Sequence, residues 1–438
     1  MLSDTARRVD DIVASAQAKG RVPSLIAGVV RDGTLAHVSA AGEVPRPEPD
    51  MQYRIGSISK SFTAALVLQL RDEGRLDLDD PLRHHLPDGP PGTTTLRQLL
   101  GHVGGLQREP DGQWWERSAG KDSDDLLAGV SATKMAYPPN HRYHYSNLAY
   151  GLLGTLVERI AGESWRTQVT KRLLEPLAMN RTTYHATEPF ARGYVVHPWH
   201  GTLREEPRHD AGAMAPAGQL WSTVADLAVW AAFLANPAPS VLSPASVAQM
   251  CTPTVIDDVD AWTSGYGLGL RLWRRGERVY VGHTGSMPGY LAVQATHRPS
   301  RTGVVAFANA YTLHHSSIDT LGLDLLDAAV DETPVRVAPW RPGAAPPPEV
   351  EMLTGRWWWM GREYSAAWDA AARQLVMSSL TSPDATPWRF IQEGVDRWRC
   401  RSGSNDGEVL TVRRSGTGGI AALDIATFVF TRDPWSAL

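Results

Sequence analysis

Apolar residues recur with helical spacing at several places along the chain. Near its start, Val9, Ile12, Val13 and Ala16 repeat every three or four positions, which predicts an amphipathic helix over residues 3–19. The apolar run at residues 62–70 predicts a largely buried helix. Further helices are expected at residues 96–100, 147–161, 222–235 and 315–331. Between residues 80 and 255 we therefore expect mainly helices and loops.

Two other regions contain the shorter apolar runs that are typical of β-strands. Residues 23–40 hold two runs separated at Asp32-Gly33, a pair that favours a hairpin turn. Successive antiparallel strands are expected at residues 266–273, 278–283, 290–295 and 303–308. We expect both regions to share one sheet, with the helical part of the chain inserted between them.

The pattern changes again toward the C-terminal end. Residues 335–350 contain five prolines and little periodicity, which predicts a linker between a first domain at 1–334 and a second at 351–438. Short alternating runs in the second domain predict a small β-barrel or sandwich. Its tryptophans are Trp357, Trp358, Trp359, Trp368, Trp388, Trp398 and Trp435. We interpret them as packing residues of the core and rim, with a ligand-binding cage as the alternative.

Composition narrows the classes of protein to which this chain can belong. Its 438 residues, 42% hydrophobic and 21% charged, are typical of a globular protein with more than one domain. A net charge of −4 provides no basic surface for nucleic acid or an anionic membrane. The polar N-terminus lacks a signal-peptide core and no apolar run reaches roughly 18 residues, so we expect a cytoplasmic protein. Cys251 and Cys400 argue against a disulfide framework but leave a single bridge open.

Candidate chemistry begins at residues 56–60, immediately before the buried helix. Ser57 and Lys60 are three residues apart, so on a helix the hydroxyl and the amine lie on one face. Serine needs a base to become a nucleophile, and lysine can be that base when burial or a nearby cation lowers its pKa. The apolar helix favours burial of Lys60. It also places Ser57 at a helix N-terminus, where N–H groups stabilise negative charge.

The same Ser-x-x-Lys spacing occurs twice more, so the spacing alone is a weak signal. Ser118 and Lys121 stand in a charged loop, where Lys121 should remain protonated. Ser131 and Lys134 precede a Tyr-Pro-Pro sequence that interrupts regular structure. Ser57 and Lys60 could also be a solvated pair of side chains without a catalytic role. Of the three serines, however, only Ser57 leads into a long apolar helix.

Two later segments carry side chains that would complete such a site. Tyr145 and Asn147 stand where a helix is predicted to begin. A tyrosine can relay a proton, and an asparagine can bind a substrate carbonyl and the lysine amine. His283, Thr284 and Gly285 come at the end of a predicted strand, where the glycine allows a substrate backbone to approach the strand edge.

In this order, the three segments resemble the motifs of the serine β-lactamase and penicillin-binding-protein superfamily. Residues 99–106 and 217–223 also fit its branch of class C β-lactamases, D-alanyl-D-alanine carboxypeptidases, D-aminopeptidases and β-lactamase-type carboxylesterases. The resemblance covers residues 5–330. It implies an α+β fold, a β-lactamase/transpeptidase-like domain in which helices flank an antiparallel sheet and a helical subdomain is inserted.

The resemblance implies a role for each matching residue. Ser57 is the nucleophile that becomes acylated, and Lys60 is its general base. Tyr145 passes a proton to the leaving group and activates the second acceptor. Asn147 holds the amide of the acyl side chain.

The third motif supplies the remaining part of the implied site. His283 stands where β-lactamases usually have lysine, which weakens the expectation of β-lactamase activity. A neutral or protonated imidazole can bind a carboxylate or pass a proton to an attacking amine. Thr284, Gly285 and Ser286 are expected to bind substrate, and the N–H groups of Ser286 and Ser57 would form an oxyanion hole.

Histidine at this position resembles some carboxypeptidases and the penicillin-binding-protein-type thioesterases that cyclise nonribosomal peptides. Residues 353–357 resemble the Gly-x-Trp opening of lipocalin-like barrels, and those cytoplasmic thioesterases carry such a barrel after the catalytic domain. The resemblance implies that a peptidyl or acyl (thio)ester, which a carrier protein can present, is taken onto Ser57 and released as a macrocycle by amine attack. A hydrolase of the same chemistry (carboxylesterase, D-aminopeptidase or D-alanyl-D-alanine carboxypeptidase) and a binding protein without turnover are the alternatives.

Other reactive side chains indicate no second chemistry. His197, His200, His209 and Asp210 could hold a metal, but Pro198 argues against a helix that presents two imidazoles together. The chain contains no His-Glu-x-x-His, Gly-x-Ser-x-Gly, Walker or dinucleotide-binding motif. We therefore predict no metal, no cofactor, and neither a nucleic acid nor a membrane as a partner.

Overall fold

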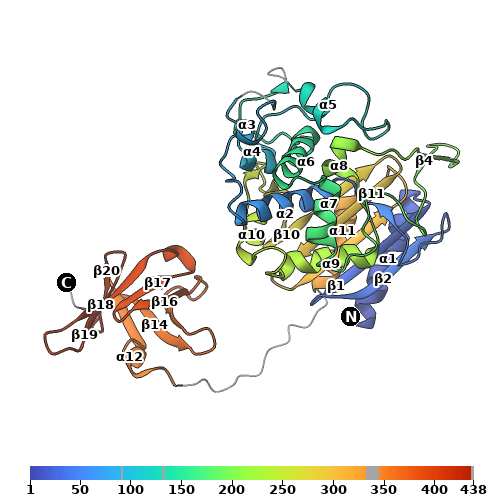
Figure 1. Ribbon diagram of the computed structural model, residues 1–438. Helices are drawn as coiled ribbons and strands as arrows, with labels where there is room; N and C mark the ends of the chain where they lie inside the picture. Colours follow the sequence, from blue (N-terminus) through green and yellow to red (C-terminus); the bar gives the residue numbers. More distant parts are fainter. Residues whose placement is uncertain (90–91, 131–133, 332–344, 436–438) are drawn as a thin grey trace. The chain divides into compact units, whose positions relative to one another are not determined.

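The computed structural model describes residues 1–89, 92–130, 134–331 and 345–435. The chain forms two compact units, residues 1–334 and residues 335–438 (Figure 1). Residues 335–344 of the predicted linker lie outside the described residues, and the short helix α12 (Pro348–Glu351) overlaps its end. Each unit has its own hydrophobic core.

The first unit is organised around an eight-stranded antiparallel sheet with the order β2-β1-β12-β11-β10-β9-β8-β7. Its strands are β1 (Ser24–Arg31), β2 (Thr34–Gly42), β7 (Val255–Ile256), β8 (Ser264–Tyr266), β9 (Arg271–Arg275), β10 (Arg278–Met287), β11 (Tyr290–His297) and β12 (Thr302–Ala308). Because β1 pairs with β12, the two predicted strand regions do share one sheet. The hairpin turn is also confirmed, since Asp32 and Gly33 have φ angles of 47° and 84°.

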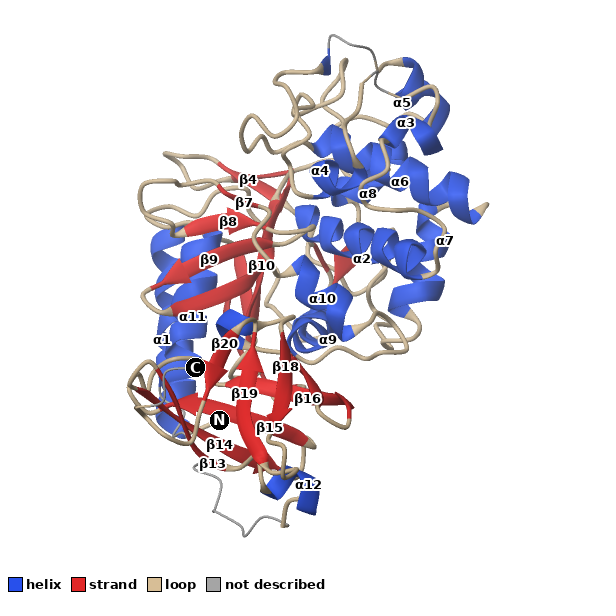
Figure 2. Ribbon diagram, turned by 90° about the vertical axis from the view of Figure 1, so that its left-hand side faces the viewer, coloured by secondary structure: helices blue, strands red, loops and turns tan. Residues whose placement is uncertain are grey.

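Helices cover both faces of this sheet (Figure 2). The covering helices are α1 (Ser3–Gly20) and α11 (Ile318–Asp331) on one face, and α2 (Ser59–Asp72) and α9 (Val224–Ala235) on the other. Leu25 and Val29 of β1 belong to the core beneath α1 and α11, whereas Ile26 and Val30 belong to the core beneath α2 and α9. Successive residues of a strand point to opposite faces, so an entirely apolar strand needs cover on both sides.

The helical insert lies between β2 and β7. Its elements are β3 (Tyr53–Arg54), η1 (Gly56–Ile58), α2, α3 (Leu82–His85), α4 (Leu96–Leu100), α5 (Ser123–Ala128), α6 (Asn147–Ala161), α7 (Trp165–Val169), the π-helical turn η3 (Thr170–Leu174), β4 (Tyr194–Val196), β5 (Leu203–Glu205), η4 (Gly212–Met214), α8 (Ala215–Gly218), β6 (Trp221–Ser222), α9 and α10 (Pro244–Met250). The predicted helices at 96–100 and 147–161 are confirmed, and the others differ from the prediction at their ends. Residues 59–70 of α2 are all buried, as the apolar run indicated.

Two strand predictions are wrong in their bounds. The single strand expected at residues 266–273 is a hairpin of β8 and β9. Gly269 makes this turn possible because its φ of 76° is a conformation that glycine adopts without strain. The strand expected to end near His283 continues to Met287, which still pairs with Tyr290 of β11. The third motif therefore lies inside β10.

The second unit is an antiparallel barrel of eight strands, in which each strand pairs with the next along the chain. The strands are β13 (Gly355–Trp359), β14 (Arg362–Asp369), β15 (Gln374–Ser379), β16 (Trp388–Gly394), β17 (Arg397–Cys400), β18 (Val409–Arg414), β19 (Ile420–Ile425) and β20 (Phe428–Phe430), with the short turn η5 (Gly403–Asn405) after β17. A bridge between Trp358 and Thr431 brings the segment after β20 back onto β13, so the barrel is nearly closed. The predicted α+β architecture with a small C-terminal barrel is thus confirmed.

Side chains fill the interior of this barrel. Trp357 and Trp398 are buried there together with Phe390 and Leu410. An eight-stranded barrel is just wide enough for its side chains to fill it. Trp357 and Trp398 are core residues, as interpreted, whereas Trp435 is 89% exposed.

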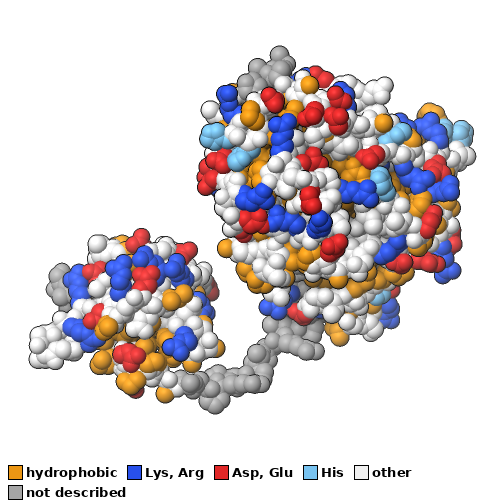
Figure 3. Space-filling view, in the orientation of Figure 1, with side chains coloured by type: hydrophobic (Ala, Val, Ile, Leu, Met, Phe, Trp, Pro, Cys, Tyr) orange, Lys and Arg blue, Asp and Glu red, His pale blue; other side chains and the backbone are white. Residues whose placement is uncertain are grey.

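Acidic and basic side chains are interspersed on the face of the molecule in Figure 3. Among the described residues, no helix has both the length and the apolar character needed to cross a lipid bilayer. Cys251 and Cys400 are both free thiols in the structure, and they belong to different units.

Candidate active site

Ser57 lies in the 3-10 turn η1, between strand β3 and helix α2. Its neighbours Ile55 and Ile58 are fully buried and anchor the turn on both sides of the serine. Gly56 has a φ of 51°, and a Cβ at this position would lie 2.6 Å from the backbone nitrogen of Ser286 on β10. The turn therefore requires glycine, which allows it to lie directly against β10.

Lys60 lies in the first turn of α2, and its side chain is fully buried. Its Nζ is 3.0 Å from Ser57 Oγ and donates a hydrogen bond of 2.7 Å to the carbonyl oxygen of Ala217. The ring centres of Tyr145 and Tyr150 lie 4.9 and 5.6 Å from the amine. No carboxylate among the described residues forms an ion pair with Lys60.

These surroundings change the protonation of Lys60. Burial lowers the pKa of Lys60 to about 7, while the negative charges of Glu109 and Glu116 act in the opposite direction. A substantial fraction of the amine is therefore neutral at neutral pH and has a lone pair that can accept the proton of Ser57. The apolar setting predicted for Lys60 is confirmed.

The hydroxyl of Tyr145 reaches the same serine. It forms a hydrogen bond with Ser57, and burial raises the pKa of the phenol well above its usual range. The guanidinium of Arg108 lies 5.4 Å from the centre of its ring. Because burial disfavours a phenolate, Tyr145 is a neutral phenol that can pass a proton. The structure thus brings Ser57, Lys60 and Tyr145 together.

Asn147 is the first residue of α6. Its Nδ2 donates to Glu109 Oε1 at 2.8 Å, and Trp115 Nε1 donates to the other oxygen of Glu109 at 2.8 Å. Its Oδ1 is buried and has no hydrogen-bond partner among the described residues. The amide is therefore held so that it offers an acceptor to a substrate. The expected contact with Lys60 is wrong, because that amine bonds to a carbonyl of α8 instead.

His283 is buried inside β10, and both of its ring nitrogens are engaged. Its Nδ1–H donates to the carbonyl oxygen of Thr284, and its Nε2 accepts a hydrogen bond of 2.9 Å from the hydroxyl of Tyr266. Burial, together with the nearby Lys60, lowers the pKa of His283 to about 3. Of the two forms considered for this imidazole, the structure favours the neutral one.

The rest of the third motif lies against the turn that carries Ser57. Strand β9 pairs with β10 as far as Gly282, and beyond it this edge of β10 faces η1. A Cβ on Gly285 would lie 1.8 Å from the carbonyl oxygen of Ile55 and 3.2 Å from the nitrogen of Ser57. The N–H groups of Ser57 and Ser286 thus belong to two segments in direct contact, which is the arrangement that the predicted oxyanion hole requires.

His102 and Tyr266 support this site, although the motifs gave neither a role. His102 is buried with a φ of 57°, and its Nδ1 accepts the backbone N–H of Ser146 at 3.1 Å. Its ring lies 4.3 Å from that of Tyr145 and 4.6 Å from that of Tyr266. His102 lies within residues 99–106, which matched the superfamily, and this match was the available signal for it.

Glu116 was also missed, and it adds a carboxylate near the buried amine. Burial, followed by the negative charge of Glu109, raises its pKa to about 7, whereas the charges of Lys60, Arg54 and Arg108 lower it. Its Oε2 is buried and has no hydrogen-bond partner among the described residues. Its sequence neighbourhood resembles any charged loop, and two of the charged groups that act on it, Arg54 and Lys60, come from β3 and α2.

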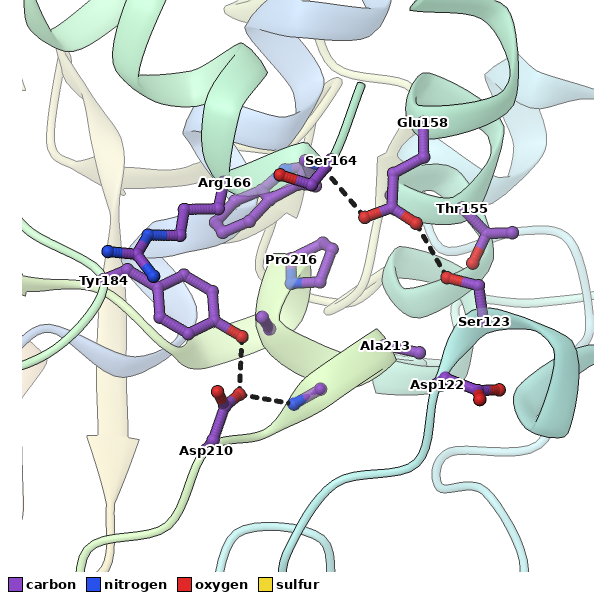
Figure 4. Close-up of a pocket in the computed structure, with 14 residues that line it drawn as sticks. Asp122, Ser123, Thr155, Glu158, Ser164, Arg166, Tyr184, Asp210, Ala213 and Pro216 are labelled. Carbon is purple, nitrogen blue, oxygen red and sulfur yellow. Dashed lines mark hydrogen bonds between the residues drawn. The ribbon is translucent and has the colours of Figure 1, made fainter. Parts of the chain in front are cut away.

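A cavity of about 380 Å³ is lined in part by Ala215 and Pro216 of α8 (Figure 4). Glu158 accepts hydrogen bonds there from the Ser123 hydroxyl at 2.7 Å and from a backbone N–H at 2.9 Å. Asp210 accepts a hydrogen bond of 2.6 Å from the Tyr184 hydroxyl. The lining of the cavity includes none of the predicted site residues. Glu158 and Asp210 already have hydrogen-bond partners within the protein.

The histidines considered as metal ligands do not assemble a site. His197 and His200 stack with ring centres 4.4 Å apart, through a turn and not a helix. Within the described ranges, no group of three His, Cys, Asp or Glu side chains is arranged to hold a metal ion.

Comparison with known proteins places this geometry in a family. The model of the Beta-lactamase family matches residues 9–328, and residues 346–432 match a domain of unknown function (DUF7586). Protein flp of Staphylococcus aureus is 23% identical over 324 residues, which is 70% of this chain. The chain spans 64% of the length of that curated relative.

Two solved structures are similar in fold. A D-stereospecific amidohydrolase from Streptomyces sp. is 26% identical with a TM-score of 0.63, over 75% of this chain and 99% of that one. SurE is 24% identical with a TM-score of 0.61, over 98% of this chain and 99% of that one. The fold is therefore the β-lactamase type of serine hydrolases and acyltransferases. Because the family model matches most of the first unit, this chain belongs to the beta-lactamase family.

Proposed function

We propose that this protein is a serine acyltransferase that forms an acyl-enzyme at Ser57. The observation that carries the proposal is the 3.0 Å approach to Ser57 Oγ of Lys60 Nζ, whose pKa burial lowers to about 7. An amine that is partly neutral at neutral pH is a suitable general base for a serine hydroxyl. Membership of the beta-lactamase family supports the same chemistry.

In the first step, Lys60 accepts the proton of Ser57 while Oγ forms a bond to the acyl carbon of a (thio)ester. The N–H groups of Ser57 and Ser286 stabilise the negative charge on the carbonyl oxygen. As the bond to the leaving group breaks, Tyr145 passes its proton to the leaving thiol or alcohol and regains one from Lys60. The products are the Ser57 ester and the free thiol or alcohol.

In the second step, an amine of the same acyl chain takes the acyl group from Ser57. The proposed substrate is a nonribosomal peptidyl thioester, presented by a carrier protein in the cytoplasm and released as a macrocycle. A neutral His283 in place of lysine and the barrel unit after the catalytic unit support this reading. The similarity to a D-stereospecific amidohydrolase supports an acyl residue of D configuration.

Hydrolysis is the second candidate, in which water takes the acyl group. The same similarity favours it, because that protein is an amidohydrolase. The acylation step is identical in both candidates, so they differ in the acceptor alone.

Product analysis separates the two candidates. The full chain is incubated with a linear peptidyl thioester that has a free N-terminus and a D-residue at its C-terminus, and the products are separated and weighed by mass spectrometry. The proposal predicts a cyclic product that is one water lighter than the linear acid. Linear acid as the sole product would assign the protein to the hydrolases.

Covalent labelling tests the acyl-enzyme itself. An alkyl phosphonate probe should add its mass to the intact protein, and Ser57→Ala should abolish the addition. Ser118→Ala is the matched control, because Ser118 has the same spacing to a lysine, and it should label like the wild type. A label that survives Ser57→Ala would disprove the nucleophile, and no label on the wild type would favour a binding protein.

A further inference from the structure

His102 bonds to the backbone on both sides of Tyr145. Its carbonyl oxygen accepts the N–H of His144 at 2.8 Å, and its ring Nδ1 accepts the N–H of Ser146 at 3.1 Å. Its ring also lies against that of Tyr145, with ring centres 4.3 Å apart. A single residue thus holds the tyrosine through both of its neighbours and through one face of its ring.

Tyr145 has no regular structure of its own to hold it. Residues 143–146 belong to no helix or strand, and α6 begins only at Asn147. His102 follows α4, which packs against α6 (Figure 1). The bonds from His102 therefore tie the irregular segment to the helical framework. Because the Tyr145 hydroxyl bonds to Ser57, a shift of this segment would separate the two groups.

The ring of His102 is neutral and accepts through Nδ1. A nitrogen that accepts an N–H carries no proton, so the ring proton is on Nε2. Burial, together with the charge of nearby Lys60, holds the pKa of His102 well below its usual range, so Nδ1 remains an acceptor at neutral pH. The residue is only 1% exposed, and Nε2 has no hydrogen-bond partner among the described residues. The imidazole therefore acts through the residues that it holds and not on a substrate directly.

Two features of His102 oppose folding. Its φ of 57° is strained for a residue with a side chain, and its Nε2–H is buried without a described partner. Glycine would avoid the first cost and leucine the second, but neither side chain offers an acceptor to Ser146. Strain of this kind persists where the surrounding structure holds it in place, and it gathers at active sites. Both features belong to the residue that holds Tyr145, so the role of His102 is best sought in what Tyr145 does.

We propose that His102 is a positioning residue that places the Tyr145 phenol for proton transfer to the leaving group. This inference rests on the proposed function, in which Tyr145 protonates the thiol or alcohol that leaves as Ser57 is acylated. A leaving group that departs as a stable anion needs no such proton, whereas a basic alkoxide does. His102 therefore determines which acyl donors react, since donors with basic leaving groups depend on it and activated esters do not.

The test compares two donors that share an acyl group and differ in leaving group, the p-nitrophenyl and ethyl esters of N-acetyl-D-alanine. For the full chain, kcat/KM of each ester reports acylation, because it includes no step after release of the first product. We expect His102→Leu to lower kcat/KM about 100-fold for the ethyl ester and less than about fivefold for the p-nitrophenyl ester. Tyr145→Phe should show the same selective loss, because it removes the proton itself.

Two further variants separate the acceptor from the rest of the imidazole. His102→Asn retains an oxygen where Nδ1 stands and adopts a positive φ readily, so kcat/KM of the ethyl ester should stay within about tenfold of wild type. His102→Gly also adopts this conformation but offers no acceptor, so it should behave like His102→Leu. It replaces the leucine variant if that variant does not fold.

His144→Leu is the matched control, one residue before the tyrosine. The side chain of His144 packs on Tyr137, with ring centres 5.1 Å apart, and its backbone N–H still bonds to His102 in the variant. Both esters should therefore react at the wild-type rate. Melting temperatures establish which of the variants are folded.

The possible failures can be told apart. Reaction of the wild type with neither ester would overturn the acyl-enzyme of the proposed function, and this inference with it. Reaction with the p-nitrophenyl ester alone would overturn the proton transfer assigned to Tyr145, and again this inference. Equal losses for the two esters in a folded His102→Leu or His102→Gly would overturn the inference alone, and so would the absence of any loss. A loss in His102→Asn as large as that in His102→Leu would overturn the assigned acceptor.

Discussion

Lys60 and Lys134 are both buried lysines that follow a serine by three residues, but their surroundings differ. Lys134 forms an ion pair with Asp111. Lys60 lies on an apolar helix, and its amine contacts a hydroxyl, a carbonyl oxygen and two aromatic rings. Burial without an ion pair lowers the pKa of Lys60. Identical spacing therefore gives a candidate base in one place and a structural cation in the other.

Ser118 and Lys121 form the remaining pair with this spacing, and its lysine is not buried. Lys121 is exposed, and the hydroxyl of Ser118 donates to the backbone of Trp114 and not to the amine. Ser131 lies outside the described residues. The three lysines thus cover a buried amine without an ion pair, a buried amine with one, and a solvated amine.

The largest effect is expected from Lys60→Met. Loss of the general base should slow phosphonate labelling by about 100-fold to 10,000-fold. The same change should raise the free energy of unfolding at pH 7, on the order of 1–2 kcal/mol, because it removes an amine that burial disfavours. Labelling kinetics and chemical denaturation measure the two effects. Lys134→Met, which should label normally and lose stability, is the opposite control. A Lys60→Met protein that labels at the wild-type rate would contradict the assigned base.

The pH dependence of labelling should follow the neutral form of Lys60. Burial lowers its pKa to about 7 from 10.5, so the rate should rise through pH 7 and level off above it. At pH 6 it should be about tenfold below the plateau. The free energy of unfolding should also rise with pH. Between pH 7 and pH 10.5 the unfolded chain binds more protons than the folded one. The cost of burying Lys60 therefore falls as the pH rises through this range. A rate that is flat from pH 6 to 8 would show that Lys60 is not the titrating base.

Lys134→Met should have a moderate effect on stability and little effect on chemistry. It removes the ion pair with Asp111 and leaves that carboxylate, 65% exposed, to be hydrated by solvent. We expect a loss of about 1 kcal/mol in the free energy of unfolding, measured by urea denaturation. Asp111→Asn should lose a similar amount. If labelling falls as far as in Lys60→Met, the contrast between the two buried lysines fails.

The smallest effect is expected from Lys121→Met. An exposed lysine away from the site should change the free energy of unfolding by less than about 0.5 kcal/mol and leave the labelling rate unaltered. The comparison is sharpened if Lys121→Met and Lys134→Met label alike although they differ in stability. A marked loss of labelling in Lys121→Met would mean that the loop around it takes part in the reaction.

Local patterns predicted much of the fold. The Asp32-Gly33 hairpin and the helix at 147–161 follow from short-range preferences, and both were found. The strand bounds near Gly269 and Met287 were wrong, because a tight glycine turn and the pairing with β11 decide where those strands begin and end. The pairing of strands in a sheet depends on residues far apart in the sequence, so an apolar run alone does not predict where a strand ends.

The site residues that lie in ordered motifs were named from the sequence, and the structure brings Ser57, Lys60, Tyr145 and His283 to one place. The donor and acceptor roles were not predictable. Asn147 turns its nitrogen to Glu109 and keeps its oxygen free, since Glu109 is held in turn by Trp115. Such assignments depend on residues far apart in the sequence.

The sequence by itself determined which reactive side chains this protein has, their order, and that Ser57 leads into an apolar helix. Tertiary structure alone decided what those side chains can do. In the folded protein β10 packs against η1, and the Lys60 amine donates a hydrogen bond to a carbonyl oxygen of α8. A buried oxygen of Glu116 has no hydrogen-bond partner among the described residues. The physical reason is that a pKa and an unsatisfied hydrogen bond are properties of the surrounding atoms, and folding selects those atoms from distant parts of the chain.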